Sequence, residues 1–321
     1  MNYFFTIIAS LAVSTTALAN SGKDSVFRNM NRCGNFVHFD QTNLYSGFGS
    51  YSHPLSGWRT AKSGFVNVHP LDGSNVKTWS TDDSAVDVVT YNNRAFVLTY
   101  SNLEEWDLTT HSRVAKYPTH GSRREFARKE HPMGLDIAGD QIVIAHGSLG
   151  VSIFDLNSRS IIFDQALIQS QSPLKSMATD VAIVNDTAFI LMDNLSLVGK
   201  FQKPAFRGLV LLDIKNQKVI SELDKLDPGA DAIVANKDKL IISFMGQPIW
   251  SYKTADFRNK KKKMPRPHRR SWKFGSKGHP TKKPFLENEN YYTCFSMAPN
   301  VKGGRYTRGP MKMNTVTYFG I

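Results

Sequence analysis

The sequence has few cysteines and lacks the short motifs that mark common enzyme sites. Its 321 residues include only two cysteines, and neither belongs to a Cys-x-x-Cys pair or a zinc cluster. No HExxH or HxH spacing occurs, and no GxSxG, P-loop or GxGxxG lies at a strand–helix junction. These absences exclude the local signatures of zinc proteases, serine hydrolases and nucleotide-binding α/β proteins. No long helical periodicity is present, although 41% of the residues are hydrophobic and a large core is expected.

Long apolar runs are also missing beyond the first twenty residues. The chain opens with MNYFFTIIASLAVSTTALAN, where an apolar stretch from Tyr3 to Val13 precedes the small-residue site Ala17-Leu18-Ala19. This pattern is typical of a signal peptide over residues 1–19, although its first residues carry no Lys or Arg. A membrane anchor is the alternative, but the run is shorter than the roughly 20 residues that span a bilayer. We therefore expect a periplasmic or secreted protein whose mature chain has no transmembrane segment.

Between Ala85 and Tyr252, four units repeat one pattern of short apolar strands. Each unit opens with a small residue and an aspartate, continues through an apolar strand, a polar turn and a second strand, and then a loop and further strand follow. The opening aspartates, spaced by 49, 44 and 51 residues, are Asp87, Asp136, Asp180 and Asp231. All-strand repeats of about 40–50 residues indicate a β-propeller, whose blades stack around an axis and leave little exposed sheet edge.

Segments that flank the repeats supply further strands. GNFVHFD, NLYSGFGSYSH and GFVNVHPLDGSNVKTW fit an earlier blade, while NYYTCFSMAP and NTVTYFGI fit a last blade or complete one shared with the N-terminus. We therefore predict an all-β fold, a β-propeller of about five or six four-stranded blades. Its predicted parts are the signal peptide at 1–19, blades at 20–257, a basic loop containing Pro and Gly at 258–283, and a last blade or ring closure at 284–321.

The two cysteines fall at the two ends of this ring. Cys33 lies in the predicted first blade and Cys294 in the last, and these blades are neighbours when the ring closes. Since an even cysteine count in an exported protein favours a disulfide, we predict a Cys33–Cys294 bond that clasps the ring. Two unrelated buried thiols are the alternative.

Two of the units resemble a known family of propellers. GLDIAGDQIVIAHGSLGVSIFDLNSRSII and ATDVAIVNDTAFILMDN, which resumes as RGLVLLDIKNQKVI, are similar to the LVIVD-repeat, WD40-like (YVTN-type) β-propellers of exported bacterial proteins. The match covers roughly Ala85–Phe244, and several units replace the family's Tyr-Val-Ala-Asp run with FVLTY, IVIAH or FILMD. The resemblance implies the propeller fold and a binding or scaffolding role, and it implies no reaction.

Positive charge is concentrated in one segment. The formal net charge is +13, and Arg258–Lys283 carries twelve Lys or Arg and no acidic residue, so the rest of the chain carries +1. Prolines and glycines exclude a continuous helix there. The candidate binding residues of this segment are Lys260, Lys261, Lys262, Lys263, Arg266, Arg269, Arg270, Trp272 and Lys273.

We interpret this basic segment as a loop outside the propeller that contacts a polyanion. Its cations neutralise phosphate or carboxylate groups, and its aromatic rings stack on sugars or bases. Export favours lipopolysaccharide, cell-wall glycan, glycosaminoglycan or extracellular DNA as the partner, and a propeller face offers room for a protein partner. A solvated loop with incidental charge is the main alternative, and a processing site or an import signal also stays open.

The repeated aspartates and three histidines are the remaining candidates for chemistry. If the units superpose, the four aspartates face the central channel, where they would either hold a hard cation such as Ca²⁺ or accept hydrogen bonds from backbone N–H groups of the next blade. No other cofactor is expected. We also consider three of the nine histidines as a catalytic cluster at one rim beside Asp136. These three are His120, His131 and His146.

The sequence thus predicts an exported binding propeller rather than an enzyme. The alternative is a metal-dependent propeller hydrolase that uses the Asp-lined channel and the rim histidines, although surface or hydrogen-bonded histidines are commoner.

Overall fold

The computed structural model is dominated by β-strands. It describes residues 23, 25–26, 36–49, 64–119, 133–147, 149–165, 177–193, 206–227, 230–244, 249–257, 263–271, 278–280, 284–287, 290–297, 301–302, 305–306 and 314–318. The predicted signal peptide, residues 1–19, lies outside these ranges. A single 3-10 helix is assigned within the described elements, η2 (Thr254–Phe257).

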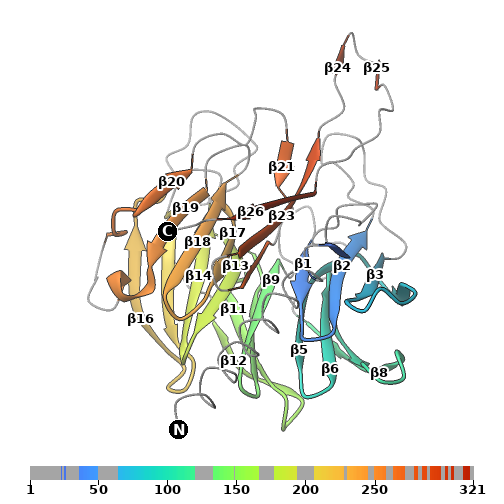
Figure 1. The fold of residues 1–321 in the computed structure, drawn as a ribbon. Helices are drawn as coiled ribbons and strands as arrows, with labels where there is room; N and C mark the ends of the chain where they lie inside the picture. Colours follow the sequence, from blue (N-terminus) through green and yellow to red (C-terminus); the bar gives the residue numbers. More distant parts are fainter. Residues whose placement is uncertain are drawn as a thin grey trace, which may run out of the picture.

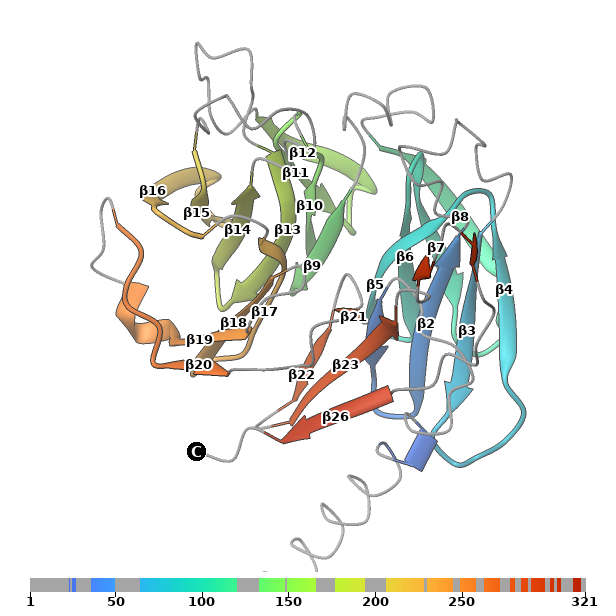
Figure 2. The same ribbon diagram turned by 90° about the horizontal axis from the view of Figure 1, so that it is seen from above.

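Five sheets of four antiparallel strands follow one another along the chain and form the blades of a β-propeller (Figure 1 and Figure 2). Blade 1 contains β1 (Val37–Phe39), β2 (Asn43–Gly49), β3 (Gly64–Pro70) and β4 (Lys77–Thr81). Blade 2 contains β5 (Ala85–Tyr91), β6 (Arg94–Thr99), β7 (Asn102–Asp107) and β8 (Arg113–Pro118). Blade 3 contains β9 (Gly134–Ala138), β10 (Gln141–Ala145), β11 (Val151–Asp155) and β12 (Ser160–Gln165).

The remaining two blades complete this series. Blade 4 contains β13 (Met177–Val184), β14 (Thr187–Asp193), β15 (Gly208–Asp213) and β16 (Lys218–Asp224). Blade 5 contains β17 (Ala230–Ala235), β18 (Lys239–Phe244), β19 (Ile249–Lys253) and β20 (Arg269–Ser271). The prediction of an all-β propeller with five or six four-stranded blades is confirmed, with five regular blades.

Burial of the strands changes from the axis outward, because neighbouring blades cover the inner strands on both faces. Residues Ala85–Val89 of β5 are all buried, and the runs AFVLT in β6 and IVIA in β10 are buried as well. The outermost strands β8, β12 and β16 instead alternate between exposed and half-buried residues over most of their length. This difference is expected for a strand that has a neighbour on only one side.

The outer hairpins are closed by an aspartate that ends the third strand of a blade. Asp107, Asp155 and Asp213 each use Oδ1 to accept a hydrogen bond from a backbone N–H three residues later, at 2.8, 2.6 and 2.9 Å respectively. Such a side-chain contact replaces the backbone pairing that stops at the turn. In these three blades, an aspartate therefore marks the end of the third strand.

A further sheet lies between blade 5 and blade 1 (Figure 2). Its strands are β21 (Gly278–Pro280), β22 (Phe285–Glu287), β23 (Asn290–Met297) and β26 (Asn314–Tyr318), and a separate hairpin consists of β24 (Val301–Lys302) and β25 (Arg305–Tyr306). β23 pairs with the other three strands of the sheet. Its connectivity therefore differs from the up-and-down order of the five blades.

Two adjacent side chains of β22 contact the two ends of the blade series. The ring of Phe285 lies 5.2 Å from that of Phe39 in blade 1, and the next residue, Leu286, packs against the cluster of Val234, Ile241 and Ile249 in blade 5. Successive residues of a strand point to opposite faces, so one short strand covers an apolar surface on either side. β22 therefore joins the first blade to the fifth.

The basic segment differs from the predicted loop. Residues Arg269–Ser271 form β20, which pairs with Ile249–Ser251 of β19, so blade 5 takes its fourth strand from inside the segment. β20 is a short edge strand, and charged residues on such strands discourage pairing with other chains. The requirement for a fourth strand in the blade explains why this part of the segment is ordered against the sheet.

Candidate functional site

Three of the four repeated aspartates join neighbouring blades. In each, Oδ1 accepts a hydrogen bond from the backbone N–H of the following residue at 2.8–2.9 Å, and Oδ2 accepts one from the first strand of the next blade at 2.7–3.0 Å. The pairs of aspartate and donor residue in the next blade are Asp87–Leu135, Asp136–Ile183 and Asp180–Ile233. This geometry matches the structural role that the sequence left open beside cation binding.

Asp231 does not occupy the position equivalent to the other aspartates. In blades 2 and 4 a β-bulge precedes the aspartate, so that Asp87 pairs with Leu98 and Asp180 with Leu191. In blade 5 the bulge falls on Asp231 itself, and Ala232 takes the paired position opposite Ser243. The backbone of Asp231 therefore does not share the paired register position of the other three aspartates, because a bulge shifts the register by one residue.

A cation site receives no direct support from these contacts. Both carboxylate oxygens of Asp87, Asp136 and Asp180 already accept hydrogen bonds from backbone groups. Over the ranges that the structure describes, no three His, Cys, Asp or Glu side chains gather as a metal site would require. The suggested Ca²⁺ site therefore rests on the sequence pattern alone.

The three candidate histidines are not seen together. His120 and His131 lie outside the described residues. His146 is completely buried, and its Nε2 lies 2.6 Å from the hydroxyl oxygen of Ser152 on the neighbouring strand β11. A histidine without access to solvent is suited to holding the end of β10 in place, and a substrate would not reach it.

Part of the basic segment is fixed to the propeller through its backbone. The N–H of Met264 donates to the carbonyl of Asp224 in blade 4 at 3.1 Å, and the N–H of His268 donates to the carbonyl of Ser251 in blade 5 at 2.8 Å. The Met264 side chain packs against the apolar cluster shared by blades 4 and 5. This stretch therefore lies across the junction of the two blades.

Beside these anchors, two candidate cations are exposed. Lys263 and Arg266 are open to solvent, and neither forms an ion pair with another residue that the structure describes. The side chain of His268 is also exposed, and its Nε2 lies 3.1 Å from a carboxylate oxygen of Asp256 in η2. The exposed charges thus stand on an anchored stretch of backbone.

The other candidates of the segment are only partly placed. Arg269 and Arg270 belong to β20, where their backbone position is known. Lys260, Lys261, Lys262, Trp272 and Lys273 lie outside the described residues. Their part in binding stays a prediction.

The predicted disulfide also stays a prediction. Cys33 lies outside the described residues, and for Cys294 only the backbone is placed, opposite Asn314 in the pairing of β23 with β26. Thiol counting under denaturing conditions tests the bond, because two free thiols would reject it.

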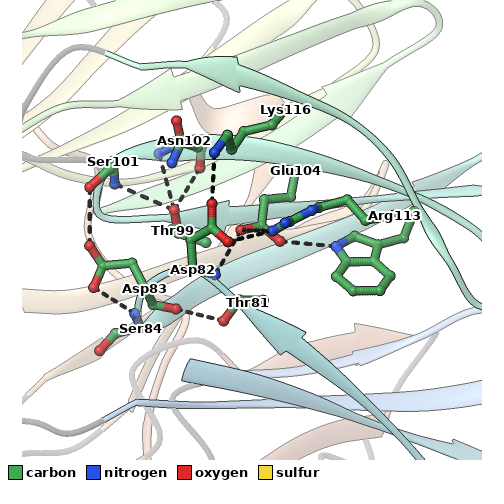
Figure 3. Close-up of polar contacts among 11 residues, drawn as sticks. Thr81, Asp82, Asp83, Ser84, Thr99, Ser101, Asn102, Glu104, Arg113 and Lys116 are labelled. Atoms are coloured by element: carbon green, nitrogen blue, oxygen red, sulfur yellow. Dashed lines mark hydrogen bonds and ion pairs between the residues drawn. The ribbon is translucent and has the colours of Figure 1, made fainter. Parts of the chain in front are cut away.

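A polar network at the junction of blades 1 and 2 was not anticipated from the sequence. Figure 3 shows Asp82, in the connection between β4 and β5, between Arg113 and Lys116 of β8. Both ion pairs of Asp82 measure 2.8 Å. The network ties the connection between the blades to the outer edge of blade 2.

A buried glutamate lies beneath this network. Glu104 is fully buried and accepts hydrogen bonds from the N–H of Asp82 at 3.0 Å and the indole of Trp106 at 3.2 Å. Burial raises the pKa of Glu104, while these donors and the Arg113 guanidinium favour its ionised form. The sequence signal was present as two consecutive acidic residues inside the strand NLEEWD.

Comparison with known proteins supports the fold. No family model matches the chain and no curated protein does, so the LVIVD-repeat resemblance stays a prediction. Among solved structures, the chain is similar to the WD40 repeats of RRP9, with a TM-score of 0.55, 11% identity, and coverage of 86% of this chain and 76% of that one. It is also similar to U3-55K, with a TM-score of 0.54, 8% identity and coverage of 84% and 76%.

A third solved structure is the WD40 domain of Pan2 from Neurospora crassa. Its TM-score is 0.50 and its identity 13%, over 81% of this chain and 85% of that one. These identities are too low to carry a function, and together the three structures show that the chain has a WD40-like propeller fold. Among the residues that the structure describes, no helix has the length and apolar character needed to cross a membrane.

Proposed function

We propose that this propeller is a binding protein whose basic segment contacts an anionic polymer. The fold supports a binding or scaffolding role in general, because propellers present rigid faces and loops to partners. The finer assignment rests on the charge of Arg258–Lys283 and on the way its middle is attached to blades 4 and 5.

The observation that carries the proposal is the exposure of Lys263 and Arg266 on an anchored backbone. Met264 is held between them by its hydrogen bond to Asp224 and by packing in the core. Cations on a fixed backbone lose less conformational entropy on binding than cations on a free tether, so more of the electrostatic attraction contributes to affinity. The remaining lysines and arginines add positive charge along the same stretch of sequence.

The chemical class of the partner follows from the cations. Arginine binds phosphate, sulfate or carboxylate groups through two parallel N–H donors, whereas lysine acts as a point charge. Export, which rests on the sequence of residues 1–19, directs the choice to lipopolysaccharide, cell-wall glycan, glycosaminoglycan or extracellular DNA. A protein partner on a propeller face is compatible with the same role.

The test neutralises two anchored cations instead of deleting the segment, because deletion would also remove β20 and Met264 from the fold. A 20-base-pair DNA duplex serves as the probe, and its binding to the Lys263→Ala/Arg266→Ala variant is measured by fluorescence anisotropy between 50 and 200 mM salt. Two lost phosphate contacts should make the negative slope of log K against log salt less steep by about 1.8 and lower the affinity at 0.1 M salt by about 60-fold.

The matched control is Lys77→Ala/Lys218→Ala, which removes two exposed lysines from the outer strands of blades 1 and 4. This variant has the same net charge as the test variant, so it measures the effect of overall charge alone. Equal losses in the two variants, or no loss in either, would reject the basic segment as the binding site.

A further inference from the structure

A cavity of about 630 Å³ lies at the junction of blades 3 and 4, away from the basic segment. Three isoleucines contribute apolar walls, Ile137 from β9, Ile183 from β13 and Ile214 from the turn after β15. Three charged residues on the neighbouring turns also line the cavity, namely Asp140, Asp186 and Lys215. This volume falls within the range of about 300–1,000 Å³ that is usual for ligand sites.

The hairpin of blade 3 has an unusual length, which helps to form this cavity. Asp136 pairs with Val143 across the β9–β10 hairpin, whereas Asp87 and Asp180 pair with Leu98 and Leu191 in blades 2 and 4. The hairpin of blade 3 is therefore two residues shorter on each strand.

A hydrogen bond brings the tip of this short hairpin beside blade 4. The N–H of Ile183 donates to Asp136 at 2.7 Å, and both hairpins turn within three residues beyond that bond, at Gly139 and at Asn185. Gly139 has a φ of 57°, and a Cβ atom there would meet nothing within 4 Å. Since no side chain extends from this turn position, the space beside it stays open.

The carboxylates of the lining are available to a cation. Asn157 donates to Oδ2 of Asp140, which holds that carboxylate in position, and Oδ1 accepts no side-chain hydrogen bond from another described residue. Asp186 is exposed and makes no hydrogen bond or ion pair through its side chain with another described residue. Lys215 brings one positive charge to the lining against the two carboxylates, and it also lowers the pKa of Asp213, in smaller part than the hydrogen bonds from Asn216 do.

We propose that this cavity binds an arginine or lysine side chain presented by a peptide segment of a partner protein. The aliphatic stem of such a residue packs against Ile137 and Ile183, and its charged head reaches Asp140 and Asp186. Long cationic side chains bury their stems on apolar surface while the head keeps polar partners.

The experiment uses two peptides that differ in one charge. The probe is acetyl-Gly-Ile-Arg-Gly-amide, and its control contains citrulline, which has the shape of arginine without the charge. Binding to the full protein is followed by amide chemical shifts in 150 mM salt. We expect shift changes centred on Gly139, Asp140, Asn185 and Asp186 with the arginine peptide, and at least ten-fold weaker binding of the citrulline peptide.

Substitutions then assign the charge that is recognised. Asp186→Lys should weaken binding of the arginine peptide by at least ten-fold, because a repulsive charge replaces an attractive one. Glu222→Lys is the matched control, since it makes the same charge change at an exposed position of β16 outside the cavity, and it should leave binding within about two-fold. Absence of peptide binding, equal binding of the citrulline peptide, or equal effects of the two substitutions would overturn the proposal.

Discussion

The hydrogen bonds between blades lead to a quantitative prediction at Asp180. This carboxylate is 2% exposed and accepts from the N–H of Val181 at 2.8 Å and from the N–H of Ile233 in the next blade at 2.9 Å. The substitution Asp180→Ala removes both acceptors and leaves two N–H groups without them at the junction of blades 4 and 5.

The expected loss follows from the cost of an unsatisfied buried donor. That cost is about 1–3 kcal/mol for each group, so Asp180→Ala should lower the free energy of unfolding by about 2–6 kcal/mol. Asp180→Asn keeps one acceptor oxygen and should lose about half as much. Asp186→Ala in the same blade is the control, because this exposed side chain makes no hydrogen bond or ion pair with another described residue, and the variant should stay within about 0.5 kcal/mol of the wild type.

Urea unfolding followed by tryptophan fluorescence measures these differences. The midpoint should fall in the order wild type, Asp180→Asn, Asp180→Ala, while the slope with denaturant stays unchanged. The same titration with added Ca²⁺ separates the two roles considered for the aspartates. A cation held by these carboxylates would stabilise the folded state by mass action, whereas acceptors of backbone hydrogen bonds give no response to Ca²⁺.

Two results would refute the reasoning. If Asp180→Ala unfolds at the wild-type midpoint, the hydrogen bond to Ile233 does not hold the blades together. If Ca²⁺ raises the wild-type midpoint and has no effect on Asp180→Ala, the carboxylate binds a cation and the structural role is rejected.

Three further predictions concern other parts of the propeller. Phe285→Ala should lower the free energy of unfolding by about 1–3 kcal/mol, because it removes the half-buried ring through which β22 packs against blade 1. An unchanged urea midpoint would show that β22 does not hold blade 1 in place. Lys116 and Arg113 lower the pKa of Asp82, so its ion pairs stabilise the folded state above the unfolded pKa of about 3.9, and this stability is lost as the pH falls through the folded pKa. Asp82→Asn should therefore lose less free energy of unfolding in acid than the wild type does. An equal loss in both proteins would contradict this. Burial and the hydrogen bond to Glu105 raise the pKa of Tyr117 to about 12. Ultraviolet titration should therefore find the same number of tyrosines ionising near pH 10 in the wild type and in Tyr117→Phe, with one tyrosine lost near pH 12 in the variant. A tyrosine lost near pH 10 instead would contradict the raised pKa.

Much of the fold could be predicted from the sequence because propeller blades are local structures. The turn at Asn92-Asn93, for example, joins two apolar runs that pair directly as β5 and β6. Asp107, Asp155 and Asp213 mark the ends of strands through contacts within three residues. A pattern that acts over such short distances can be recognised in one chain without knowledge of its neighbours.

The candidate sites were harder to predict because they depend on contacts between blades. Asp231 carries the same local sequence as the other aspartates, yet a bulge displaces it by one residue. The basic segment has the composition of a loop, but the edge of β19 recruits Arg269–Ser271 as a strand. The cavity between blades 3 and 4 has no motif, since its lining comes from turns of two different blades.

The sequence by itself determined the kind of fold and the concentration of charge. The fold follows from the alternation of apolar residues, from the turn-forming residues and from the repeat length. These features act between residues that are close along the chain, and they dictate strands that stack as blades. Only the tertiary structure decided how those blades meet, which carboxylates receive backbone N–H groups, where the cations are anchored, and how β22 joins the ends. These outcomes depend on how separate sheets are positioned and aligned relative to one another. Packing between the blades sets that arrangement, and no single segment of the chain encodes it.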